Sequence, residues 1–212
     1  MSNTPQPRIG QALTTLARTL TANRQAAQPA NTKRLAAPWL VVIDPQVVFA
    51  DVASPWAAHG FGTAMDVIAD MAPRFGDRVI VTRWLPGKLR VGSWRAYFKR
   101  WEFADRPPTD PMFNLVPDAQ RLSALTTIDL PTFGKWGPTM RMLIGPTPNL
   151  VLTGFSTDCC VVSTALAAAD SGATVRVISD ACAASSDENH QGALKLMDNF
   201  APQIKVISAA QL

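Results

Sequence analysis

Residues Leu150–Asp170, LVLTGFSTDCCVVSTALAAAD, decide the fold of this chain. The stretch begins with a short apolar run rich in β-branched side chains, which predicts a buried strand that ends at Gly154. Thr157 and Asp158 are residue types that favour the start of a helix, and the alanine-rich run to Ala169 predicts that helix. A strand, a tight turn and a helix in succession are the repeating unit of a parallel sheet.

Cys160 falls in the first turn of this predicted helix. Backbone N–H groups have no intrahelical partner there and the helix dipole is positive, so both effects stabilise a thiolate, which is the nucleophilic form of cysteine. Adjacent cysteines such as Cys159 and Cys160 are equally typical of small buried apolar side chains. Taken alone, the stretch leaves both interpretations open.

Three motifs carry a resemblance to a known family. Gly154-Phe155-Ser156-Thr157-Asp158-Cys159-Cys160-Val161, followed by Ala165 and Ala169, resembles the G-x-x-T-x-x-C-V nucleophile turn of the isochorismatase-like cysteine hydrolases. Leu40-Val41-Val42-Ile43-Asp44-Pro45-Gln46, with Phe49, resembles the first strand of that superfamily, which ends in a catalytic aspartate. Gly134-Lys135-Trp136 stands where the catalytic lysine of the superfamily is expected. The resemblance covers residues 38–212. The superfamily includes nicotinamidases and N-carbamoylsarcosine amidohydrolases.

The resemblance implies a three-layer Rossmann-like α/β fold, in which a mostly parallel central sheet is flanked by helices. Apolar runs and helical periodicity along the chain favour the same architecture. The predicted strands are Trp39–Ile43, Arg78–Thr82, Thr126–Leu130, Asn149–Thr153, Thr174–Ser179 and Ile204–Ile207. The predicted helices are Phe61–Ala72, Thr139–Ile144, Val161–Ala169 and Glu188–Asn199, and Asp180–Ala183 is expected to form a turn.

The resemblance also implies the site chemistry. Cys160 is expected to attack an amide carbonyl, Asp44 to carry the proton, and Lys135 to keep Asp44 ionised. The backbone N–H groups of Ser156 and Cys160 would form the oxyanion hole, and the family's non-proline cis peptide maps to Phe155–Ser156. The expected reaction is hydrolysis of a C–N bond of a small molecule through a thioester. The alternatives are vinyl-ether or ester-like hydrolysis, or a catalytically silent binding subunit.

Two further expectations concern the substrate pocket and metals. The irregular, aromatic stretch Arg83–Asp110 is expected either to pack on the core or to roof the pocket. The pocket candidates are Gln46, Phe49, Trp84, Trp94 and Trp136. The chain has only two histidines, His59 and His190, so we expect no catalytic metal and no cofactor, which argues against a nicotinamidase.

Charge and cysteine content limit the partners and the compartment. Five of the 20 basic residues precede the first acid, Asp44, which leaves 15 basic and 16 acidic residues in the rest of the chain. A domain without a basic field is not expected to bind nucleic acid. No apolar run is long enough to span a membrane and no secretory signal is visible, so a cytoplasmic protein is expected. Three cysteines, two of them adjacent, do not form a disulfide framework.

Residues 1–37 are expected to form an N-terminal arm and linker, and 38–212 the hydrolase domain. Four apolar residues at helical spacing predict an amphipathic helix in the arm, Ile9, Leu13, Leu16 and Leu20. The arm is interpreted as a floppy terminus, as a contact with a second subunit, or as an organellar transit peptide, in that order. We expect a homo-oligomer, because the superfamily is commonly oligomeric and an apolar stripe on a short helix needs burial.

Overall fold

Among residues 37–212, which the computed structural model describes, six strands form one sheet in the order β3-β2-β1-β4-β5-β6. Every pairing between neighbouring strands is parallel. The strands are β1 (Trp39–Ile43), β2 (Val79–Trp84), β3 (Ile128–Leu130), β4 (Asn149–Phe155), β5 (Thr174–Ala183) and β6 (Ile204–Ile207). The predicted fold class is therefore confirmed.

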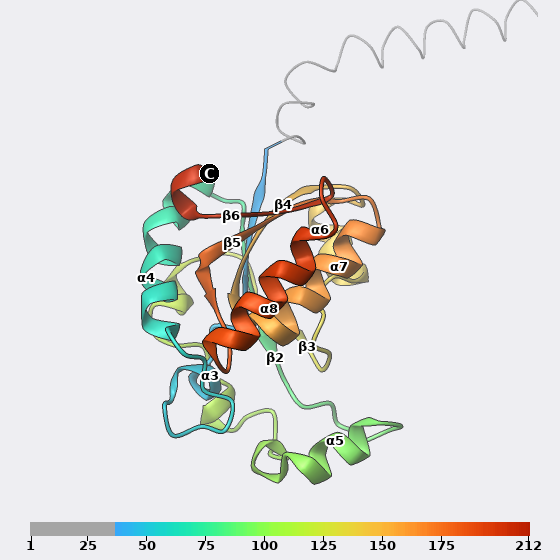
Figure 1. The fold of residues 1–212 in the computed structure, drawn as a ribbon. Helices are drawn as coiled ribbons and strands as arrows, with labels where there is room; N and C mark the ends of the chain where they lie inside the picture. The colour runs from blue at the N-terminus through green and yellow to red at the C-terminus, as the bar shows by residue number, and fades with distance from the viewer. Residues whose placement is uncertain (1–36) are drawn as a thin grey trace, which may run out of the picture. The chain divides into compact units, whose positions relative to one another are not determined.

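Helices cover both faces of the sheet, with α4 on one side and α7 and α8 on the other (Figure 1). The α-helices are α3 (Val47–Ala50), α4 (Phe61–Met71), α5 (Trp94–Arg100), α6 (Pro138–Ile144), α7 (Val162–Asp170) and α8 (Asp187–Asp198). A π-helical turn, η5 (Thr157–Val161), directly precedes α7. The 3-10 turns are η1 (Ala72–Phe75), η2 (Glu102–Ala104), η3 (Pro111–Phe113), η4 (Ala119–Arg121) and η6 (Ala209–Gln211).

Strand β1 is buried on both faces because its side chains alternate between two cores. Val41 and Ile43 pack with residues of α6, α7 and α8, whereas Leu40 and Val42 pack with residues of α4. All four side chains are fully buried. A central parallel strand with covered faces needs apolar side chains at successive positions, which explains the unbroken apolar run in the sequence.

The sequence predicted that this strand ends before Gly154, but β4 continues through Gly154 to Phe155. Gly154 has a φ of +113°, and it pairs with Ile43 of β1. A Cβ at this position would lie 2.1 Å from the carbonyl oxygen of Ile43. The glycine therefore allows a close approach of two central strands, which a glycine pattern in the sequence does not distinguish from a turn.

Strand β5 is also longer than predicted, because the expected turn Asp180–Ala183 is part of it. The pairing of β5 with β4 shifts register between Leu152 and Gly154, and beyond that point Gly154 pairs with Cys182. A bulge of this kind lets pairing resume after an irregular residue, so the strand continues through polar positions that read as a turn.

The predicted arm and its apolar stripe, Ile9 to Leu20, lie outside the described residues, so the structure does not test the interpretations of residues 1–36. In the described part of the chain, no helix is both long and apolar enough to cross a membrane. The longest irregular connection runs between β2 and β3 and contains α5 and three of the 3-10 turns. It supplies part of the cavity described below.

Candidate active site

Asp44 follows β1 at the carboxyl end of the sheet, where the strand order places β1 between β2 and β4. It has a φ of +49° and is the only non-glycine residue with a positive φ among those described. Aspartate is one of the few residue types that adopt this conformation readily. The hydroxyl of Thr82 accepts the backbone N–H of Asp44 at 3.2 Å and donates to its carboxylate Oδ1 at 2.7 Å. Thr82 thus fixes both the backbone and the carboxylate of Asp44.

Lys135 comes from the loop before α6, and its side chain is fully buried beside Asp44. Its Nζ lies 3.0 Å from Oδ2 of Asp44 and donates to the carbonyl of Thr132 at 2.8 Å. The backbone N–H of Lys135 donates to the Thr164 hydroxyl, which itself donates to the carbonyl of Cys160. One threonine of α7 therefore ties the lysine loop to the turn that carries Cys160.

The environment of Asp44 sets its acidity. Burial raises the pKa of Asp44 above its ordinary value of 3.8. The charge of Lys135 acts in the opposite direction, as do the hydrogen bonds from Thr82, Lys135 and Cys160. A carboxylate with a raised pKa that remains paired with a cation is a better proton acceptor than an exposed aspartate.

Cys160 lies in η5, at the carboxyl end of β4, and its thiol is near enough to Asp44 to lower the pKa of that carboxyl. The sequence predicted a lowered pKa for this cysteine, but the structure indicates the opposite. The pKa of Cys160 is raised by its hydrogen bond with Cys159, by burial and by the charge of Asp44, whereas Lys135 lowers it. The hydrogen bond with Cys159 and burial outweigh the start of the helix, so the resting group is a thiol that needs a base.

The turn before Cys160 contains the expected cis peptide bond between Phe155 and Ser156. The turn is held against α8 by a hydrogen bond between the Thr157 hydroxyl and Nδ1 of His190, which lie 2.9 Å apart. Burial lowers the pKa of His190. His190 of α8 thus supports the turn that carries Cys160. His59, the other histidine, is exposed and pairs through its backbone with Ala184.

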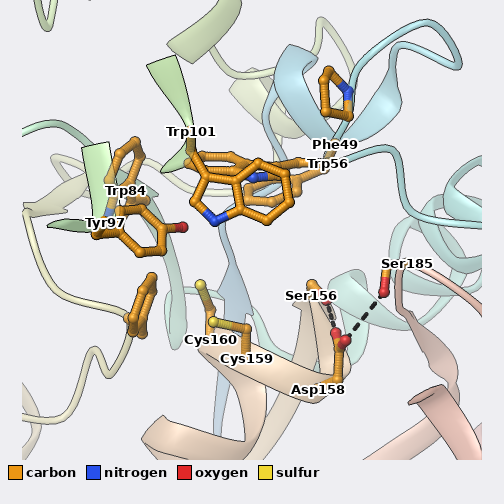
Figure 2. A pocket seen from close by; sticks show the side chains of 12 residues that line it. Phe49, Trp56, Trp84, Tyr97, Trp101, Ser156, Asp158, Cys159, Cys160 and Ser185 are labelled. Atoms are coloured by element: carbon orange, nitrogen blue, oxygen red, sulfur yellow. Dashed lines mark hydrogen bonds between the residues drawn. The ribbon is translucent and has the colours of Figure 1, made fainter. Parts of the chain in front are cut away.

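A cavity of about 420 Å³ opens above the two cysteines (Figure 2). The aromatic part of the lining, which we call the aromatic canopy, consists of the rings of Phe49, Trp56, Trp84, Tyr97, Trp101 and Phe133. The polar part, which we call the polar floor, consists of Ser156, Asp158, Cys159, Cys160 and Ser185. Asp44 and Lys135 are fully buried and are not among the lining residues.

Trp56 is the hub of the canopy. Its ring centroid lies 5.3 Å from that of Trp84, 6.0 Å from those of Tyr97 and Trp101, and 6.3 Å from that of Phe49. The canopy extends to the lysine loop through Tyr97 and Phe133, whose centroids are 5.4 Å apart. Burial raises the pKa of Tyr97 further above its ordinary value of 10.0, so its hydroxyl stays neutral.

Two of the five predicted pocket residues line the cavity, Phe49 and Trp84. The other three do not. The side-chain amide of Gln46 instead bridges backbone groups of Trp84 and Phe113, Trp94 packs beside Tyr97 and Phe133, and Trp136 packs on the sheet core. Sequence reasoning missed Trp56, Tyr97, Trp101 and Phe133 as lining residues. The aromatic density of the stretch Arg83–Asp110 was the available signal for Tyr97 and Trp101, but it did not say which rings face inward, and Trp56 and Phe133 lie outside that stretch.

The described residues contain no group of three or more histidine, cysteine or acidic side chains placed to hold a metal ion. The three cysteines, Cys159, Cys160 and Cys182, are free. Burial raises the pKa of Cys182 to about 12, and this cysteine does not line the cavity. Cys159 and Cys160 are therefore the two thiols that face the cavity.

Fold and site together define a three-layer α/β protein with a small-molecule cavity at the carboxyl end of its parallel sheet, where such folds bind ligands. A family model described as the Isochorismatase domain matches residues 38–211. The chain therefore belongs to the isochorismatase family of hydrolases, as its sequence motifs predicted.

Solved structures of low sequence identity share the fold. An isochorismatase family protein from Desulfovibrio vulgaris is 20% identical with a TM-score of 0.68, over 82% of this chain and 95% of that one. An isochorismatase from Pseudomonas putida is 20% identical with a TM-score of 0.64, over 84% and 91%. The MAR1 ribonuclease from Caenorhabditis elegans is 19% identical with a TM-score of 0.58, over 82% and 78%. At these identities the likeness concerns the fold alone.

Proposed function

We propose that this protein is a metal-independent cysteine hydrolase that cleaves a C–N bond, amide or carbamoyl, of a small molecule. The observation that carries the proposal is the fully buried Asp44–Lys135 ion pair, 3.0 Å apart, which lies behind a cysteine that lines the cavity and lowers the pKa of Asp44. A buried charge pair costs desolvation energy, and burying one directly against a thiol serves proton transfer better than it serves stability.

The proposed reaction starts with transfer of the Cys160 proton to Asp44 as the sulfur attacks the carbonyl carbon. The backbone N–H groups of Ser156 and Cys160 stabilise the oxyanion that forms. The tetrahedral species then expels the amine, which takes the proton from Asp44, and leaves a thioester on Cys160. Water next gives a proton to Asp44 and attacks the thioester, and the departing sulfur recovers that proton. Lys135 keeps Asp44 ionised before each step in which Asp44 accepts a proton.

Ribonuclease activity, the name that the neighbour from Caenorhabditis elegans carries, is not favoured for this chain. A phosphodiester backbone needs cationic partners. Among the described residues that line the cavity there is no lysine, arginine or histidine, and Asp158 adds a negative charge. Vinyl-ether hydrolysis remains the alternative on the same fold, but it gives no use to a thiol that contacts a base.

The two adjacent cysteines provide the test. Cys160→Ala should abolish release of ammonia from a panel of small primary amides, ureas and carbamoyl compounds, whereas Cys159→Ala should keep it within about tenfold of wild type. The reason is that Cys160, and not Cys159, is buried next to Asp44 and acts on the pKa of that carboxyl. Mass spectrometry of quenched wild-type enzyme should find the acyl group on Cys160.

Dialysis against a strong chelator should leave the rate unchanged, because the described residues hold no candidate metal cluster. The proposal is wrong if Cys160→Ala retains activity, if Cys159→Ala is the inactive variant, or if added metal restores activity that chelation removed.

A further inference from the structure

The two sides of the cavity differ in what they offer to a bound molecule. The canopy offers ring faces, and the floor offers thiols, hydroxyls and one carboxylate (Figure 2). Resting on the hydrolase function proposed above, we infer that the substrate is a small amide carrying an organic cation, held between the canopy and Asp158, and that amides carrying a carboxylate are excluded.

The canopy favours cations because the face of an aromatic ring carries partial negative charge. Trp56, Tyr97 and Trp101 lie across the cavity from the thiols, and their rings are packed against one another within about 6 Å. Several rings on one side of an enclosed space are the arrangement that binds quaternary ammonium groups. Trp56 packs on the buried Trp84, and Tyr97 and Trp101 pack on Trp56, so the rings are in place before a ligand enters.

The floor adds one full negative charge, that of Asp158. Its two carboxylate oxygens accept hydrogen bonds from the hydroxyls of Ser156 and Ser185, which fix the carboxylate at the edge of the cavity. Each oxygen retains a lone pair after accepting one hydrogen bond, so the group can still face a cation. Asp158 is thus held in position without being neutralised by a basic side chain.

An anionic substrate finds no partner in the same space. Of the described residues, those that line the cavity include no lysine, arginine or histidine. Lys135 is already paired with Asp44 behind Cys160, and Arg100, which packs over the ring of Trp101 at 5.4 Å, does not line the cavity. A carboxylate would therefore lose its hydration beside Asp158 and gain no counter-ion, which disfavours its binding.

Three amides of nearly equal size separate charge from shape. They are glycine betaine amide, which is a trimethylammonium cation, 3,3-dimethylbutanamide, its neutral isostere, and succinamate, an anion. Ammonia release should give the highest kcat/KM for the betaine amide, about 10- to 30-fold above the neutral isostere, in line with a desolvated cation–ring contact. Succinamate should be the poorest of the three.

Variants of Trp101 and Asp158 test which residues cause the preference for the cationic amide. Trp101→Leu should reduce the ratio of kcat/KM for the cation over the neutral isostere at least about threefold, whereas Trp101→Phe, which keeps a ring, should reduce it less. Asp158→Asn, which keeps the shape of the side chain, should also lower this ratio and should narrow the disadvantage of succinamate.

A binding measurement keeps the inference separate from the proposed reaction. Calorimetry with the Cys160→Ala protein should show tighter binding of betaine amide than of 3,3-dimethylbutanamide, and no binding of succinamate. If no amide is hydrolysed by the wild type, the proposed function fails, while this order of binding still supports the inference. If the neutral isostere or succinamate binds as tightly as the cation, the inference is overturned whatever the turnover.

Discussion

The polar floor with its ion pair and the aromatic canopy face one cavity, but they are built in different ways. Asp44 and Cys160 follow the two central strands, and the charged side chains of Asp44 and Lys135 are fully buried. The canopy rings come mostly from connections, and Trp56, Tyr97 and Trp101 are only half-buried. The groups proposed to perform the chemistry thus follow strands of the sheet, whereas the rings proposed to contact the rest of the substrate lie mostly on segments that tolerate change.

The largest expected effect comes from separating the strands that carry the floor. Gly154→Ala should lower the free energy of unfolding by about 4 kcal/mol or more, because the new Cβ would meet the Ile43 carbonyl at 2.1 Å in a conformation with a φ of +113°. Urea denaturation measures this. Gly62→Ala is the matched control: it lies in α4 with open space around it, and it should gain about 0.5–1 kcal/mol. Equal effects of the two substitutions would contradict a close-approach role for Gly154.

The next effect concerns the charge beneath the floor. Lys135→Met should cost about 3–5 kcal/mol of unfolding free energy, since it leaves the Asp44 carboxylate buried without its cation. Lys99→Met, on an exposed position of α5, should change stability by no more than about 0.5 kcal/mol.

The double variant Asp44→Asn/Lys135→Met should recover part of the loss, because it removes both charges. A double variant that is less stable than Lys135→Met would show that the loss comes from packing instead of charge.

The sequence placed Asp44 and Lys135 beside Cys160, but it named only two of the canopy rings, Phe49 and Trp84, and the reason is physical. Asp44, Lys135 and Cys160 stand in short motifs whose geometry is set by strand ends, so spacing along the chain translates into position. The inward orientation of Trp56 or Tyr97 depends on contacts between segments far apart in the sequence, and large aromatic side chains pack in cores as readily as in pockets. The acidity of Cys160 escaped prediction similarly, because it depends on Cys159, burial and Asp44 more than on its helix.

The smallest expected effect is a shift in the pH dependence of activity, set by the pKa of Asp44. Asp44 must be ionised to accept a proton, so activity should fall as the pH drops through its raised pKa, which lies above 3.8. The hydrogen bond from Thr82 lowers that pKa, so Thr82→Val should move the acidic limb of the kcat/KM profile to higher pH. Thr82→Ser keeps the hydroxyl and should keep the wild-type limb. A shift to lower pH in Thr82→Val would assign the limb to another group.

Gly154 also has a consequence for how the activity of this enzyme can be altered. The residue sets the gap between β1 and β4; Asp44 directly follows β1, and Cys160 lies in the η5 turn after β4. The separation of the proposed proton acceptor from the proposed nucleophile therefore depends on a hydrogen atom at a position that does not line the cavity. A mutant library at the canopy residues can be screened for altered substrate selectivity. In a library at position 154, every variant should lose reaction rate and folding yield together.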